Sequence, residues 1–516
     1  MCSSDLTATT FEVGGHHYAL VMLEGLTPGS TQEYTVRLDG EQRWPLSDSS
    51  MPASVIRTLG HERPLRILFG SCRAAAPHEP PWSLSATEHP SGRGVDSLRA
   101  HGLRMLSQNS EDWPDLLMLM GDQVYADDPS PETLRRMGLR PDTDTTPPGL
   151  VGGFEEYTWL YHEAWRPEVE RWLFSVVPSA MIFDDHDMID DWNISASWVR
   201  DIRREPWWQD HVLGGLASYW IYQHLGNLSP QEIRDEAMLD RLAGGGGLEF
   251  LRGWAMESEE FTPVEGGYRF SFSRDLGRTK LVVIDGRNGR NLEPPRAMVG
   301  AEEWSWIVSQ CRVEVDHLLL ATSLPVMVPG GLHGLQVWNA ALCDGRWGRL
   351  IARGSEKIRR FIDLEDWPAF EASLRALLEL VDGVRRSDTC PATISILSGD
   401  IHFSYVAEAT FEHDPAIGSR VYQLVSSPIR NSLPRRDRRI IGFALTRTGR
   451  RLGGLMTRSV RARPQPAEWT LTHGPEFANE MGLVTVRGRA MALVIERARP
   501  DDNGDPILET VIQADL

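Results

Sequence analysis

Ionisable side chains follow directly after four apolar runs of this 516-residue sequence. The motifs after these runs are Ser71-Cys72-Arg73, Asp122-Gln123-Val124-Tyr125, Asp184-Asp185-His186-Asp187 and Asp400-Ile401-His402. In open α/β sheets, ligands bind just beyond the carboxyl ends of the strands, so these motifs are expected to meet in one place. Carboxylates that lie so close repel one another unless cations stand between them. The pattern therefore predicts a metal centre with more than one ion.

The spacing within the motifs agrees with shared metal ligation. Asp122 and Tyr125 stand three residues apart, which places both on one face if the chain turns into a helix. Asp400 and His402 stand two residues apart, on the same side of an extended segment. A carboxylate at a strand end, such as Asp122, can bridge two ions about 3.5–4 Å apart.

Each motif alone has an ordinary explanation. A Gly-Asp-x-His sequence often marks a turn, and a cysteine after a strand is usually a small buried residue. An aspartate-rich segment is also a common start of a helix, because Asp is a favoured N-cap. These explanations do not account for four such motifs, each after an apolar run, so we interpret the motifs as one site.

The same segments resemble a known enzyme family. The segments Phe69-Gly70-Ser71-Cys72, Gly121-Asp122-Gln123-Val124-Tyr125-Ala126-Asp127, Asp184-Asp185-His186-Asp187 and Gly399-Asp400-Ile401-His402 are similar, in this order, to motifs of the PhoD-like alkaline phosphatases. Those enzymes are metallophosphatases related to the purple acid phosphatases, and the resemblance covers roughly residues 64 to 450. It implies an α/β fold of the four-layer α/β/β/α metallophosphatase sandwich type.

The resemblance also implies metals and their ligands. It adds Ca²⁺, makes Asp122 the bridge, and places a ferric ion on Cys72, Asp122, Tyr125 and Asp400. Asp185 and His402 are the further ligand candidates. The residue types agree with this, because a trivalent ion favours the deprotonated phenolate and thiolate. Hard oxygen ligands suit Fe³⁺ and Ca²⁺.

Four further residues are candidates for catalysis and substrate binding. By the resemblance, His186 would stand near the leaving group, where it could donate a proton or stabilise charge. The alternative for His186 is a hydrogen bond outside the metal shell. Arg287 either holds phosphate or forms a salt bridge with its neighbour. The segment 330–339 reads as a substrate-side loop, in which His333 and Asn339 are substrate-binding candidates.

The sequence departs from the family pattern near the third motif. Asp187 stands where the family usually has Glu, and Asp190 and Asp191 stand where it has asparagines. These changes add negative charge, and we expect them to alter calcium affinity.

The elements that must position these motifs follow from hydrophobic patterning. Apolar runs without alternation are typical of strands buried on both faces of a layered α/β sheet. We predict strands at residues 65–70, 116–121, 180–183, 281–284, 317–321, 393–399, 421–425, 482–486 and 491–495. Helical patterns cover residues 155–176 and 370–381, and the first of them carries an apolar stripe.

The first 60 residues show a different pattern. Short strands are expected at residues 18–23, 33–38 and 54–58, with a hairpin turn at Asp39-Gly40. A Leu-x-Pro-x-x-x-x-x-Tyr turn that begins at Leu26 resembles that of fibronectin-type domains. Three strands are too few for a sandwich of about seven. We therefore expect a partial β-domain whose start is truncated.

The chain thus divides into two parts. Residues 1–62 are predicted to form the small fibronectin-like, β-sandwich-like domain. Residues 63–516 are predicted to form the metallophosphatase domain, with a C-terminal extension after about residue 450. No signal peptide is visible, but the expected truncation leaves both a cytoplasmic and a secreted location open. No apolar run approaches the ~20 residues of a membrane span.

Composition limits the classes of partner. The formal net charge of −19 argues against a general nucleic-acid-binding protein. Five cysteines without a CxxC spacing argue against a zinc finger or a disulfide framework. Eight arginines between residues 430 and 451 reverse the charge locally. They are interpreted either as a solvated surface or as a patch for anionic substrates or for docking.

These observations predict a metal-dependent phosphoester hydrolase of the alkaline phosphatase or phosphodiesterase type. A metal-bound hydroxide or oxide would attack phosphorus in line, so no side-chain nucleophile is required. One alternative is another metal-dependent ester hydrolase on the same fold, phospholipase-like or pyrophosphate-cleaving. A second alternative is a non-catalytic metal-binding protein. The oligomeric state is not predicted from the sequence.

Overall fold

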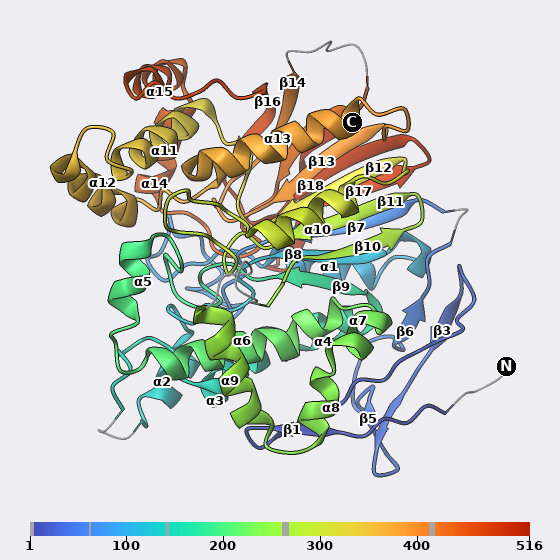
Figure 1. Ribbon diagram of the computed structural model, residues 1–516. Helices are drawn as coiled ribbons and strands as arrows, with labels where there is room; N and C mark the ends of the chain where they lie inside the picture. Colours follow the sequence, from blue (N-terminus) through green and yellow to red (C-terminus); the bar gives the residue numbers. More distant parts are fainter. Residues whose placement is uncertain (1–4, 61–62, 141–143, 261–267, 412–417) are drawn as a thin grey trace.

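Two large mixed β-sheets form the centre of the computed structural model, which describes residues 5–60, 63–140, 144–260, 268–411 and 418–516 (Figure 1). The first sheet has the strand order β10 (Phe272–Leu276), β11 (Thr279–Ile284), β12 (His317–Thr322), β13 (Thr393–Ser398), β15 (Arg420–Val425), β14 (Ser404–Phe411) and β16 (Ala467–Glu476). The second has the order β19 (Pro506–Asp515), β18 (Ala490–Pro500), β17 (Glu480–Arg487), β7 (Leu65–Gly70), β8 (Leu116–Met120) and β9 (Ser179–Ile182). The predicted α/β class is confirmed.

Parallel pairing in both sheets directs several strand ends to one side. β11, β12, β13 and β15 run parallel in the first sheet, and β7, β8 and β9 run parallel in the second. These strands are mostly buried without alternation, and β8 and β13 are buried along their whole length. This is the burial that continuous apolar runs predict for sheets covered on both faces.

The helices surround the two sheets. They are α1 (Ser97–Met105), α2 (Pro131–Met137), α3 (Phe154–Trp165), α4 (Glu168–Val176), α5 (Ala196–Ile202), α6 (Trp208–Tyr222), α7 (Pro230–Glu236), α8 (Met238–Ala243), α9 (Gly247–Glu260), α10 (Ala301–Cys311), α11 (Gly330–Cys343), α12 (Arg349–Phe361), α13 (Glu371–Arg385), α14 (Arg435–Leu445) and α15 (Arg447–Ser459). Short 3₁₀ turns lie at η1 (Ser110–Asp112), η2 (His224–Gly226) and η4 (Trp367–Phe370). Among the described helices, none combines the length and the apolar character that crossing a membrane requires.

Alternate side chains of the strands pack on opposite faces. Phe69 of β7 and Val283 of β11 belong to one apolar cluster, so these faces of the two sheets meet. Val282, the residue before Val283 and on the other face of β11, packs with α10 and α13. Leu68 of β7 packs with α1 and α4. The period-2 alternation of a strand therefore explains how each sheet contacts both its partner sheet and its helices.

The helix predicted over residues 155–176 is two helices. α3 ends at Trp165 and α4 begins at Glu168, with Pro167 at its N-cap. Proline lacks an N–H group and disfavours helical backbone in the residue before it. The apolar stripe continues through both helices, which is why the pattern alone reads as one. The second predicted helix, over residues 370–381, corresponds to α13.

The N-terminal strands form three separate two-stranded sheets within the described part of residues 1–62. The pairs are β1 (Phe11–Val13) with β2 (His16–Tyr18), β3 (Thr31–Glu33) with β6 (Val55–Arg57), and β4 (Val36–Leu38) with β5 (Glu41–Trp44). The predicted hairpin at Asp39-Gly40 joins β4 to β5. The strand expected at residues 18–23 is wrong beyond Tyr18, where β2 ends. No common sheet unites the described strands, and a domain boundary at residue 62 stays a prediction.

The residues after 450 belong to the two large sheets. β16 pairs with β14 in the first sheet, and β17 pairs with β7 in the second, with Gly482 opposite Phe69. β18 and β19 continue the second sheet beyond β17. The expected C-terminal extension is therefore corrected: this segment completes both sheets, because it supplies the partner of β7 on the side away from β8.

Candidate metal centre

The site lies where the two sheets meet, beyond the carboxyl ends of their parallel strands. The Cys72 N–H, after β7, donates to the carbonyl oxygen of Gly121 at 3.2 Å. The Arg430 N–H, after β15, donates to the carbonyl oxygen of Cys72 at 3.1 Å. The Asp400 N–H, after β13, donates to Ser71 Oγ at 3.0 Å. The short chain segment after β7 thus connects strand ends from both sheets.

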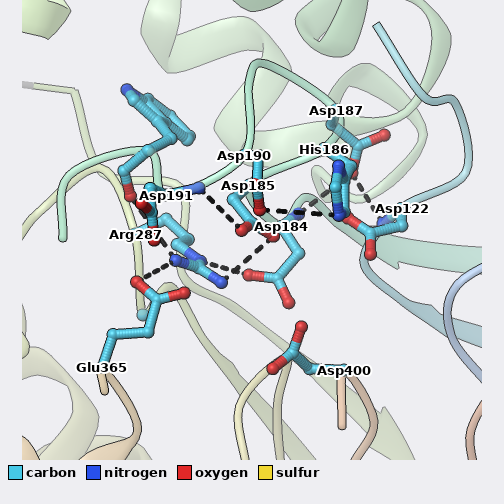
Figure 2. Close-up of polar contacts among 12 residues, drawn as sticks. Asp122, Asp184, Asp185, His186, Asp187, Asp190, Asp191, Arg287, Glu365 and Asp400 are labelled. Atoms are coloured by element: carbon cyan, nitrogen blue, oxygen red, sulfur yellow. Dashed lines mark hydrogen bonds and ion pairs between the residues drawn. The ribbon is translucent and has the colours of Figure 1, made fainter. Parts of the chain in front are cut away.

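Three of the predicted metal ligands meet at this segment. Cys72, Asp122 and Asp400 each place one ligand atom within 4.8 Å of the other two. By the same measure Asp122 belongs to two further groups, one with Asp184, Asp185 and Asp400 and one with Asp185 and His186. Figure 2 shows these carboxylates entering one region from different chain segments. Asp122 is common to all three groups, which is the placement that a bridging ligand requires.

Left-handed backbone at the strand ends sets the direction of these side chains. Positive φ occurs at four predicted ligands: +59° at Cys72, +51° at Asp122, +65° at Asp400 and +54° at His402. Such backbone costs about 1–3 kcal/mol at a non-glycine residue and persists where the surrounding structure enforces it, often at functional sites. Gly121 precedes Asp122 with φ +100°, and a β carbon there would lie 2.4 Å from that of Asp184. Glycine at 121 therefore allows two motifs to approach.

Tyr125 lies beside Asp122 and His186. Its hydroxyl donates a hydrogen bond to Asp122 Oδ2 at 3.5 Å, and its ring centroid lies 4.6 Å from that of His186. Burial raises the pKa of the Tyr125 hydroxyl well above its usual value, and the negative charges of Cys72 and Asp122 raise it further. A cation at this position would favour the phenolate instead.

The carboxylates of this site outnumber the positive side chains around them, which are Arg287 and His186. Burial raises the pKa of Cys72, Asp122 and Asp400 well above their usual values, and neighbouring carboxylates add to the rise. Asp122 Oδ1 and Asp184 Oδ2 are buried without a hydrogen bond. Buried carboxylate oxygens need a partner, and a cation is one. The donor types and these free oxygens fit a metal ion.

The two predicted histidines differ in protonation. His186 Nδ1 lies 2.9 Å from both carboxylate oxygens of Asp127. Burial acts to lower the pKa of His186, but Asp127 and Asp185 raise it well above its usual value. Burial lowers the pKa of His402 to about 4, and the charge of His186 acts in the same direction. A neutral imidazole can bind a metal and an imidazolium cannot. His402 is therefore suited to ligation, although none of the compact groups found among the described residues includes it.

Arg287 is enclosed by acidic side chains. It is 0% exposed, and its guanidinium contacts Asp184, Asp185 at 3.2 Å and Glu365 at 2.5 Å (Figure 2). Its own N–H donates to Asp285 Oδ1 at 2.7 Å. The salt bridge considered with its sequence neighbour is thus a backbone hydrogen bond. The guanidinium instead forms ion pairs with three carboxylates, those of the adjacent residues Asp184 and Asp185 and that of Glu365.

Two carboxylates of the site have roles that sequence reasoning missed. Asp187 accepts hydrogen bonds from backbone N–H groups of the second and third motifs at 2.9–3.3 Å. It therefore fixes both motif loops, whereas its sequence position suggested only added charge. Glu365 forms ion pairs with Arg287 and with Arg290 at 3.0 Å. It follows no apolar strand, so no sequence pattern could identify it.

The segment predicted as a substrate-side loop is helical. Residues 330–339 form the first part of α11. Asn339 is fully buried and donates to the carbonyl oxygen of Ser355 at 2.9 Å. The His333 ring packs edge-on against Trp469, with centroids 5.2 Å apart. The structure gives both side chains packing partners outside the metal-ligand groups.

The glycines of this segment explain the wrong loop prediction. Residues 330–339 were predicted as a substrate-side loop, but their glycines permit close helix packing. A β carbon at Gly334 of α11 would lie 2.4 Å from the Cα of Gly453 on α15. The small residues are therefore required by a contact with a helix more than a hundred positions away, which the local sequence does not reveal.

Known proteins resemble this chain in its N-terminal residues and in its overall fold. The sequence profile of a domain of unknown function (DUF7800) matches residues 1–56. No curated protein matches the sequence. A solved structure described as "Structure of PhoD" is similar with a TM-score of 0.52 and 11% identity, over 96% of this chain and 77% of that chain. The chain therefore has a PhoD-like fold.

Proposed function

We propose that the protein is a metal-dependent hydrolase of phosphoric mono- or diesters, on the four-layer α/β/β/α arrangement of the metallophosphatases. The observation that carries the proposal is the group of buried Cys72 and Asp122 with half-buried Asp400, whose ligand atoms lie within 4.8 Å of one another. The PhoD-like fold supports it, as does the resemblance of the four motifs to those of alkaline phosphatases.

The proposed metals are Fe³⁺ and Ca²⁺. The ferric ion would be held by Cys72, Tyr125, Asp122 and Asp400, and the calcium ion by Asp122 with Asp185 and His402. Thiolate and phenolate ligands favour a trivalent ion, and carboxylate oxygens suit both ions. When bound, such ions supply Lewis-acid stabilisation of phosphoryl charge and lower the pKa of bound water.

The protein's own residues would supply a proton and hold the ligands in place. In this proposal His186 acts as an imidazolium: Asp127 accepts from Nδ1, and the Nε2 proton, on the side of Asp190 3.9 Å away, would pass to a leaving group. Arg287 is a positioning residue in this proposal, because its guanidinium contacts Asp184 and Asp185 and has no exposed surface.

The proposal is tested by metal analysis together with an assay of one phosphomonoester and one phosphodiester. We expect bound iron, colour from a ferric phenolate or thiolate, and hydrolysis of at least one ester that chelation abolishes. Colourless, iron-free protein that still cleaves phosphoesters would remove the iron assignment and leave the hydrolase. Folded, metal-loaded protein that cleaves neither ester contradicts the proposal. Cleavage of only phospholipid or pyrophosphate would favour the alternative hydrolases.

A further inference from the structure

Three helices with exposed apolar side chains lie together at one side of the molecule. α12, α14 and α15 each pack on α11, away from the two sheets (Figure 1). We call the solvent-exposed sides of these three helices together the helical face, and define it by the exposed residues Leu350, Ile351, Ile358 and Phe361 on α12, Ile440 and Phe443 on α14, and Leu452 and Leu455 on α15. Several large apolar side chains exposed on neighbouring helices usually mark an interaction site.

The amphipathic helix α12 exposes its apolar side to solvent, whereas an ordinary surface helix buries it. Leu350, Ile351, Ile358 and Phe361 lie within an arc of about 100° on the helix, and Leu350 and Phe361 are 82% and 79% exposed. The opposite side is polar and packed inward. Its Ser355 accepts a hydrogen bond from Asn339 of α11 at 3.0 Å. A helix that buries its polar side and exposes its apolar side needs an apolar partner.

The pair α14–α15 repeats this arrangement with glycine on the inner side. Gly449 and Gly453 of α15 are buried, and Gly453 lies against the backbone of α11. Leu452 and Leu455 point outward and are about half exposed or more. No residue of α14 is fully buried. The close glycine packing therefore fixes these helices while their larger apolar side chains remain outside.

The helical face is strongly cationic in an acidic protein. α12, α14 and α15 together contain thirteen Arg or Lys residues and two acidic residues, whereas the whole chain has a net charge of −19. Ten of the thirteen are exposed: Arg349, Arg353, Lys357, Arg435, Arg436, Arg439, Arg447, Arg450, Arg451 and Arg458. In the part of the chain that the structure describes, none of these ten forms an ion pair. Their charge is therefore available to an anionic partner.

We propose that the helical face binds the surface of an anionic lipid bilayer, with its apolar side chains in the acyl boundary and its arginines at the headgroups. Apolar side chains flanked by cations on interfacial helices are what such a surface recognises. A second copy of the chain would bring two cationic faces together, and like charges repel. A nucleic acid would pair with the arginines but leave Leu350 and Phe361 in water.

The proposal is tested by sedimentation of the purified protein with vesicles. We expect binding to vesicles of phosphatidylglycerol and phosphatidylcholine, weaker binding as salt is raised, and little binding to pure phosphatidylcholine. The double variant Leu350→Ser/Phe361→Ser should lower the partition by about tenfold or more. Arg450→Gln/Arg451→Gln should lower it by a similar factor through lost headgroup attraction.

A matched control lies on α2 and just beyond it, where Arg135 and Leu139 are also highly exposed. Arg135→Gln/Leu139→Ser removes the same residue types and should leave vesicle binding unchanged. Hydrolysis of a soluble phosphoester and thermal unfolding are measured for each variant, so a loss of fold is distinguished from a loss of binding. The proposal is overturned if wild-type protein ignores anionic vesicles, or if the control loses as much binding. It is also overturned if the wild type is a dimer that Leu350→Ser/Phe361→Ser separates and that binds no vesicles.

Discussion

Two largely buried clusters of ionisable residues lie close together, yet they are built differently. One, the ligand cluster, consists of Cys72, Asp122 and Asp400. The other, the arginine cluster, consists of His78, Asp96 and Glu170 together with Arg73, which contacts both carboxylates. In each cluster the potential ligand atoms lie within 4.8 Å of one another. Closeness of ligand atoms alone therefore does not distinguish a metal site from a structural cluster.

The partners of the carboxylates distinguish the two clusters. In the arginine cluster, the Arg73 guanidinium lies 2.8 Å from Asp96 and 3.1 Å from Glu170. Burial acts to raise the pKa of both carboxyls, but Arg73, with His78 for Glu170, holds each pKa below its usual value. In the ligand cluster Arg287 acts to lower the pKa of Asp400 and His186 that of Asp122, but burial keeps both pKa values well above their usual values. Positive side chains therefore offset the carboxylates of the arginine cluster, whereas the ligand cluster has too few of them.

The largest effect is expected from removing the bridging charge of the ligand cluster. Asp122→Asn should lower kcat/KM for a phosphoester by at least about a thousandfold, or about 4 kcal/mol, because it removes a carboxylate shared by all three ligand groups. The matched control is Asp39→Asn, an exposed aspartate with nearly the same backbone, φ +52° against +51°. Folded Asp122→Asn protein with unchanged turnover would overturn the site assignment.

The next largest effect concerns the arginine cluster. Arg73→Met should lower the free energy of unfolding by about 3–5 kcal/mol, because it leaves Asp96 and Glu170 buried without their main counter-charge. Urea unfolding measures the change, and the exposed Arg135→Met variant is the control. Added metal ions should not restore the stability. Full recovery with metal would show that the arginine cluster also holds a cation and so does not differ from the ligand cluster in this respect.

Metal removal should lower the stability that depends on the ligand cluster and leave the contribution of the arginine cluster unchanged. Stripping the metal from wild-type protein should lower the free energy of unfolding by about 3 kcal/mol, the effect of losing a ligand present at about 100 times its Kd. Arg73→Met should respond to chelation as the wild type does, and Asp122→Asn should respond little. Thermal unfolding with and without chelator gives these values. An equal response in both variants would contradict the assignment of metal to the ligand cluster.

The smallest effect is a pH dependence from Asp96. Its pKa is lowered in the folded protein, so its contribution to stability is present above its unfolded pKa and is lost as the pH falls. The difference in unfolding free energy between wild type and Asp96→Asn should therefore shrink by about 1 kcal/mol from pH 6 to pH 3. Asn preserves the N-cap role of Asp96 toward the Arg99 N–H, 3.1 Å away. A difference that grows toward pH 3 would show that the pKa of Asp96 is raised instead.

The strands and the convergence of three motifs could be predicted because they follow from local pattern. Continuous apolar runs identified β7, β8 and β13, and the residues after them, Cys72, Asp122 and Asp400, do meet. Long-range packing could not be predicted this way. Residues 330–339 were predicted as a loop, because the contact of their glycines with α15 is not visible in the local sequence. Similarly, β17 pairs with β7 although more than 400 residues separate the two strands.

The sequence by itself determined which chemical groups follow the apolar strands: a thiol, a phenol, several carboxylates and two imidazoles. Only the tertiary structure decided their charge and their partners. Cys72 and Arg73 are adjacent in the chain, yet their side chains belong to different clusters: Cys72 lies with Asp122 and Asp400, and Arg73 lies between Asp96 and Glu170. Glu365, which belongs to no sequence motif, forms an ion pair with Arg287 beside the site. Protonation depends on burial and on charges brought from distant segments, and these exist only in the folded chain.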